Sequence, residues 1–135
     1  MPQSFSDLTR LFEAGDMNPS EFSHRDHVAV AYDMLSAYEF LDACGRYAAT
    51  IRALAERAGA PMKFNTTITV AFLSLIAERM AMGDYVSFED FIANNADLES
   101  KQMLDSWYSP ERLHCDMARE VFLLPNPALP QRNDY

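Results

Sequence analysis

The segment Thr66–Met82, TTITVAFLSLIAERMAM, decides how this chain folds. It runs for about seventeen residues without glycine or proline and is apolar on nearly every side. A helix that is hydrophobic all round is usually the buried, central helix of a domain. The first residues of the segment are rich in β-branched side chains, which also suit a strand. Its length, and the lack of a second strand to pair with it, favour a helix.

Helical signals continue on both sides of this segment. Ser36, followed by Glu39 three residues later, is a capping-box signature, and Leu41 and Cys44 open an apolar face at helical spacing. Ser109-Pro110-Glu111 combines a cap, a proline at the first helical position and an acid in the first turn. The further helices that we expect cover residues 6–14, 23–35, 36–58, 87–94, 97–107 and 109–122.

These segments predict an all-α fold, a single compact domain of six or seven helices around a central apolar helix. The chain has 135 residues, which is the usual size of one domain, and shows no internal repeat or interdomain linker. We therefore assign residues 1–124 to one helical domain. Three prolines close together after Leu124 predict an extended C-terminal tail over residues 125–135.

The composition argues against several functional classes. The net charge is −9, from 20 acidic and 11 basic residues, and the basic residues form no stripe, which argues against nucleic-acid binding. The longest apolar run is far too short for a membrane span, and the N-terminus lacks the pattern of a signal peptide. The two cysteines, Cys44 and Cys115, form no CxxC pair and suit a reducing compartment. We expect a cytoplasmic protein without a nucleic-acid or membrane partner.

The segment FSHRDHV (22–28) holds two of the three histidines of the chain. In the structural interpretation, Ser23 is the N-cap of a helix and Asp26 completes a capping box. Phe22 then stands where a hydrophobic staple belongs. This interpretation explains every polar residue of the segment except His24 and His27.

In the functional interpretation, His24 and His27 share one helix face with Val28, Ala31 and Leu35. Both imidazoles then point toward the core or toward the mouth of a pocket. Two such rings can hold a divalent transition metal or, when protonated, a substrate carboxylate. A catalytic zinc normally needs three protein ligands. The candidates for the missing ligands are Asp26, Asp33, Glu78 and His114.

Three short motifs of the chain resemble a family of small, largely uncharacterised bacterial proteins. The motifs are FSHRDHV (22–28), KFNTTIT (63–69) and YSPERL (108–113), and the resemblance spans about residues 20 to 124. It implies a helical fold and little about chemistry. The middle motif departs from the family pattern, because Asn65 and Thr66 stand where the pattern has His and Glu. Asn and Thr are poor ligands for zinc or iron, and this departure argues against metal catalysis.

The leading hypothesis is a polar pocket that binds a small ligand, lined by His24 and His27 beside Asn65 and Thr67. Arg112 is a further candidate, as a clamp for a carboxylate, although a helix cap with a surface Arg–Glu pair explains it as well. For His24 and His27, a purely structural role is favoured over a role as metal ligands. A role in lining a polar pocket without a metal ranks between these two. The alternative is a helical module that binds a partner or forms a homodimer through exposed aromatic and methionine side chains, with purely structural histidines.

Overall fold

The computed structural model describes residues 6–126, and in this range the chain forms seven α-helices and three 3₁₀ helices without a strand. The predicted all-α fold is therefore confirmed. The α-helices are α1 (Asp7–Ala14), α2 (His24–Ala37), α3 (Phe40–Arg57), α4 (Thr66–Ala81), α5 (Phe88–Ala93), α6 (Pro110–Leu113) and α7 (Asp116–Glu120). The 3₁₀ helices are η1 (Pro19–Glu21), η2 (Pro61–Lys63) and η3 (Ala96–Glu99).

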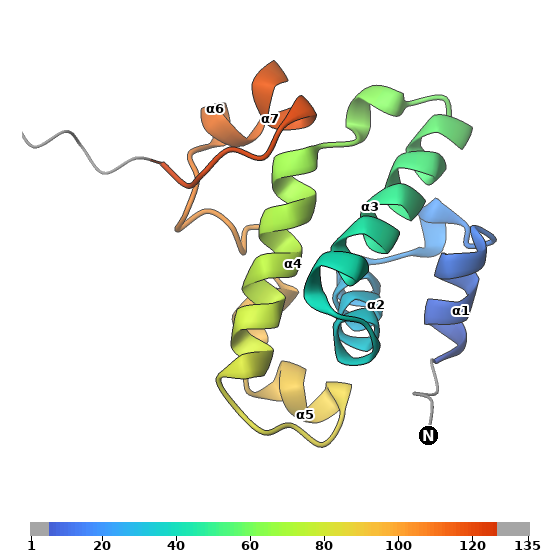
Figure 1. The fold of residues 1–135 in the computed structure, drawn as a ribbon, viewed down its shortest axis with the longest axis vertical. Coiled ribbons are helices and arrows are strands. Elements are labelled where there is room, and N and C mark those ends of the chain that lie inside the picture. Colours follow the sequence, from blue (N-terminus) through green and yellow to red (C-terminus); the bar gives the residue numbers. More distant parts are fainter. Residues whose placement is uncertain (1–5, 127–135) are drawn as a thin grey trace, which may run out of the picture.

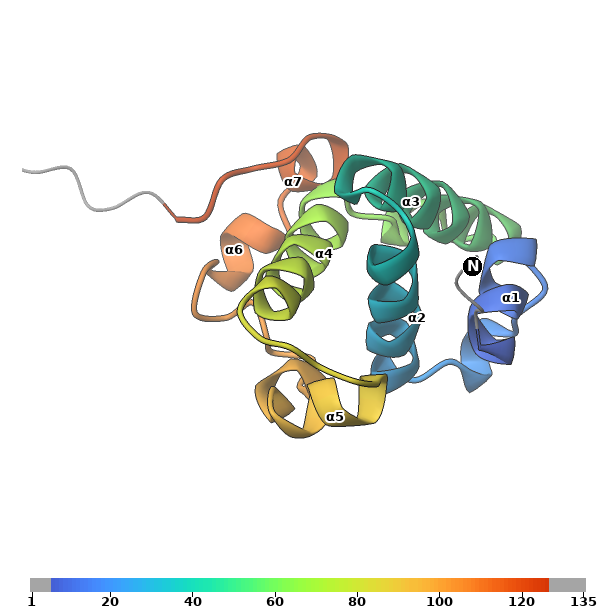
Figure 2. The same ribbon diagram turned by 60° about the horizontal axis from the view of Figure 1, so that its bottom comes forward.

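Helix α4 is the central element that the sequence predicted. It packs against α2, α3 and α7, and the side chains of Leu73 and Ile76 are completely buried. Helix α1 lies at one end of the molecule and α6 and α7 lie at the other, with α2, α3 and α4 between them (Figures 1 and 2). Asn65 begins α4 as its N-cap, because its side-chain oxygen accepts a hydrogen bond from the Ile68 N–H at 2.9 Å.

The start of α2 is fixed by the predicted capping box. The Asp26 N–H donates to Ser23 Oγ at 3.1 Å, and the Ser23 N–H donates to Asp26 Oδ2 at 3.0 Å. The predicted staple also forms, and its second member is His27, whose ring lies edge-on to Phe22 at 4.5 Å between centroids. His24 is therefore the first residue of α2, and His27 follows one turn later.

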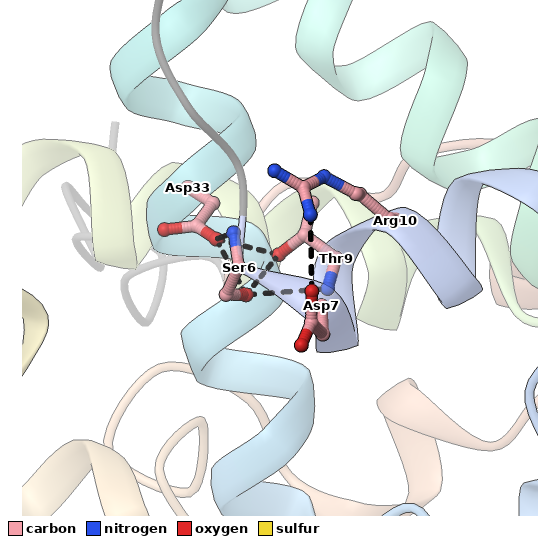
Figure 3. A network of polar contacts seen from close by, with 5 residues as sticks. All are labelled: Ser6, Asp7, Thr9, Arg10 and Asp33. Carbon is pink, nitrogen blue, oxygen red and sulfur yellow. Dashed lines mark hydrogen bonds and ion pairs between the residues drawn. The ribbon is translucent and has the colours of Figure 1, made fainter.

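Helix α1 is held against α2 by contacts to a partly buried carboxylate (Figure 3). Asp33 Oδ2 on α2 accepts hydrogen bonds from Thr9 Oγ1 at 2.6 Å and from Ser6 Oγ at 3.0 Å. Ser6 also caps α1, and Gly15 ends it with a φ of 74°, a backbone conformation that favours glycine. Asp33, a candidate metal ligand in the sequence, is thus used to join two helices.

The predicted boundary between the second and third helices was wrong. Ser36 lies inside α2, where its hydroxyl donates to the Tyr32 carbonyl at 2.8 Å, and it caps nothing. Glu39 is the N-cap of α3, and its carboxylate accepts from the Leu41 and Asp42 N–H groups. The apolar face of α3 is rotated accordingly, because Ala43 and Tyr47 are buried while Leu41 is 72% exposed.

Two predicted helices in the second half of the chain are shorter than expected. Residues 97–107 form only the 3₁₀ helix η3 and a series of turns, and the Asp97 carboxylate pairs with Arg79 at 2.7 Å instead of capping a helix. The helix predicted over 109–122 begins after the Ser109 cap as expected, but it breaks into α6 and α7. Cys115 has an extended backbone between them, and its thiol donates to the Arg112 carbonyl.

The segment after α7 folds back along α4. The buried hydroxyl of Thr67 donates to the Val121 carbonyl at 2.8 Å and accepts from the Leu123 N–H at 2.9 Å. The Asn126 N–H donates to the Trp107 carbonyl at 3.0 Å, so the chain stays attached to the domain beyond the predicted boundary at residue 124. The rest of the predicted tail, residues 127–135, lies outside the described residues. Between residues 6 and 126, no helix is both long enough and apolar enough to span a membrane.

Candidate functional site

A cavity of about 260 Å³ lies between α2, α3, α4 and the segment that follows η3. Three of the predicted site residues, His24, His27 and Asn65, line it together. Its walls are mainly apolar and are formed by Ile51, Ile68, Phe72, Met103 and Leu104. A mainly apolar cavity with a few polar groups is the usual form of a small-molecule site.

His24 is held by a residue that is distant in the sequence. Its Nε2 lies 2.9 Å from the carbonyl oxygen of Leu98, which is completely buried in η3. Because a carbonyl oxygen can only accept, Nε2 carries the proton and donates. The Nδ1 atom of neutral His24 is then an acceptor, and the ring lies edge-on to Phe72 at 6.1 Å between centroids.

His27 is held by the buried phenol of Tyr47 on α3. The hydroxyl of Tyr47 lies 3.0 Å from Nδ1 of His27. Burial raises the pKa of Tyr47, so the phenol keeps its proton and needs an acceptor, which Nδ1 supplies. Burial, together with the nearby His24, lowers the pKa of His27 to about 4, although Asp26 opposes this shift. At neutral pH His27 is therefore an uncharged ring with its proton on Nε2.

The two histidines thus present complementary hydrogen-bonding atoms. Each uses one ring nitrogen to bind the protein, and within residues 6–126 the other nitrogen has no hydrogen-bond partner. The unpaired atom is an acceptor in His24 and a donor in His27. The structure therefore positions two imidazoles and, with His24 uncharged, leaves one acceptor and one donor for a ligand.

Asn65 lines the cavity, and both ends of its side-chain amide already bind the protein. Its amide nitrogen donates to the Leu113 carbonyl at 2.7 Å, while its oxygen caps α4. Thr69, one turn later, also lines the cavity and donates to the Asn65 carbonyl at 2.8 Å. Thr69 was not predicted as a site residue, because a threonine inside an apolar helix gives no signal of a site.

Two lysines that were not predicted as site residues line the cavity as well. Lys63 ends η2 and Lys101 follows η3, and both side chains are exposed. They are the only lysines of the chain. No Asp or Glu within the described part of the chain lines this cavity. The opening therefore carries positive charge in a protein whose net charge is −9.

Thr67 and Arg112 do not join the other predicted site residues. Thr67 points to the segment after α7, as described above, and Arg112 Nε donates to the Leu124 carbonyl at 2.8 Å. Both hold the C-terminal segment in place. Glu78 lines a separate, smaller groove on α4, and His114 is exposed between α6 and α7.

The cavity does not supply the ligand set of a resident transition metal. Among residues 6–126, no group of three His, Cys, Asp or Glu side chains is placed to hold a metal ion. His24 and His27 have no third partner of this kind in the cavity lining, and the two ammonium groups repel a cation. The donor set therefore does not fit the predicted metal.

Comparison of the chain with protein families, with curated proteins and with solved structures finds no match. The resemblance to the bacterial family described above stays a prediction.

Proposed function

We propose that this protein binds a small organic molecule in the cavity between α2, α3 and α4. The observation that carries the proposal is the arrangement of His24 and His27. Each ring is fixed by one hydrogen bond to the protein and keeps its second nitrogen unpaired within residues 6–126, beside apolar walls. No buried side-chain nitrogen or oxygen between residues 6 and 126 lacks a partner, so these two nitrogens are accessible to solvent. A ligand that replaces water there and pairs with both nitrogens gains hydrogen bonds and specificity.

The volume of the cavity sets the size of the ligand. Sites for drug-sized ligands usually have volumes of about 300 to 1,000 Å³, so a cavity of about 260 Å³ suits a smaller molecule of about ten non-hydrogen atoms. The apolar walls favour a compact apolar body. His27 requires an acceptor on the ligand and His24 requires a donor, and an alcohol next to a carbonyl group provides both.

Mandelamide and mandelate, an uncharged amide and its parent carboxylate, have this size and these groups and serve as probes. Calorimetric titration is expected to give a Kd of about 1 mM or tighter for at least one of them, which is a modest affinity for a molecule of this size. Ile51→Trp places a larger ring in the cavity and is expected to abolish binding. Leu41→Trp adds the same ring to the exposed face of α3 and should leave binding unchanged.

If neither probe binds at 10 mM, or if Ile51→Trp binds as the natural chain does, the proposal is wrong. Circular dichroism of both variants controls for loss of the helical fold.

We further propose that the protein works in the cytoplasm. Cys44 on α3 and Cys115 between α6 and α7 are both free thiols. Free thiols persist in compartments that keep proteins reduced. This assignment is tested by fractionating cells that express the tagged chain.

A further inference from the structure

We propose that the ligand of this cavity is an organic anion, whose carboxylate is bound by Lys63 and Lys101 at the opening. The inference rests on the proposed function and adds the chemical class of the ligand.

The positive charges of the protein are used in two different ways. Five arginines form ion pairs with carboxylates, namely Arg10, Arg25, Arg46, Arg79 and Arg119. Within residues 6–126 neither lysine forms an ion pair, and neither do Arg52, Arg57 and Arg112. Of these five residues, only the two lysines line the cavity. The acidic residues are in excess, yet none lines the cavity that both lysines line. The chain therefore leaves two uncompensated cations at one opening.

The backbone on each side of the opening is fixed by the same contacts that build the site. Lys63 stands two residues before Asn65, which caps α4 and binds Leu113. Lys101 stands three residues after Leu98, whose carbonyl holds His24. Both lysines therefore extend from anchored segments, although the lysine side chains themselves are exposed.

An anion at this opening gains from its surroundings in two ways. Apolar walls lower the local dielectric constant, so each ammonium attracts a carboxylate more strongly than it would in open solvent. The Nε2–H of His27 is a donor, and it can bind a carboxylate oxygen. Nδ1 of His24 takes a donor, which an α-hydroxyl group provides. An α-hydroxy carboxylate with an apolar body thus fits the polar groups better than a simple hydrocarbon acid.

The test compares mandelate with mandelamide, which has the same shape without the charge. Calorimetric titrations at about 50 mM salt are expected to show mandelate binding about fivefold tighter or more, since each exposed ion pair contributes up to about 1 kcal/mol. Lys63→Met and Lys101→Met keep the length of the side chain. Each is expected to weaken mandelate binding about threefold, with little effect on mandelamide. Arg10→Met, which removes one positive charge from α1, serves as the matched control and should change neither affinity.

The outcomes separate this inference from the proposed function. Equal affinity for the two probes, or mandelate binding that neither lysine variant weakens, overturns the anion assignment while the cavity remains a binding site. Binding of neither probe overturns both. Loss of the preference for mandelate at about 0.5 M salt supports the role of the lysines, because added salt screens exposed charges.

Discussion

His27 is the residue whose charge depends most directly on the fold. Burial lowers its pKa from 6.5 to about 4. As the pH falls below 6.5, the unfolded chain takes up a proton at His27, while the folded protein does not until about pH 4. The uncharged His27 ring therefore contributes fully to the free energy of unfolding above pH 6.5. This contribution, about 3 kcal/mol in total, is lost as the pH falls toward 4.

Urea unfolding at pH 7 and pH 5 measures this linkage. Between pH 7 and pH 5, the free energy of unfolding of the natural chain should fall by about 2 kcal/mol more than that of His27→Gln, because the glutamine side chain does not titrate. An NMR titration in which the His27 ring protonates near pH 6.5 would show that the ring is not buried in this way.

His24 offers a second prediction at this scale. His24→Ala removes the ring that binds the Leu98 carbonyl and the acceptor that faces the ligand, but leaves the Ser23–Asp26 capping box in place. We expect loss of mandelate binding in calorimetry, with the helical circular dichroism signal retained. Arg25→Ala, at the next position of α2 and outside the cavity lining, is the control. Unchanged binding by His24→Ala contradicts the site.

The sequence predicted His24 and His27 because both stand out against an otherwise apolar helix face. It did not predict Tyr47, Lys63 or Lys101, since each contacts the cavity only through the tertiary fold. Thr67 was predicted as a site residue together with Asn65, which is close in the sequence. Residues at such short spacing on a helix point in different directions, and Thr67 faces the C-terminal segment.

At the scale of elements, Thr67 joins the central helix α4 to the segment after α7. Thr67→Val keeps the shape of the side chain but leaves the Val121 carbonyl and the Leu123 N–H without partners. We expect a loss of about 2 kcal/mol in the free energy of unfolding, the usual effect of leaving buried polar groups unpaired. Hydrogen exchange at the Leu123 amide should become faster as the segment after α7 loosens.

Thr66→Val is the matched control, because the Thr66 hydroxyl has no hydrogen-bond partner in the described part of the chain. If both valine variants are equally stable, Thr67 does not hold the C-terminal segment as described.

Helix starts were predicted where a local motif determines them. Ser23, Ser87 and Ser109 all cap helices as their sequences indicated. Ser36 carried the same signature and failed, because α2 continues past it and Glu39 supplies the cap instead. The helix expected over 97–107 failed because long-range contacts determine that segment, with Asp97 bound to Arg79 and Leu98 bound to His24.

For the whole molecule, one segment was enough to predict the architecture. Residues 66–81 form the central helix, as expected from an apolar stretch that must be buried on all sides. The cavity was not predictable in the same way. Its walls come from α2, α3, α4 and the turns after η3. The distances between these elements depend on how they pack in the folded protein.

The central claim is that a small ligand occupies this cavity, and an NMR titration of the ¹⁵N-labelled natural chain with mandelate tests it most directly. We expect saturable shifts concentrated at the amides of His24, His27, Thr69 and Met103, which surround the cavity. An absence of shifts at 10 mM mandelate would contradict the claim. So would shifts confined to Ala71, Trp107 and Phe122, which line the separate groove on α4.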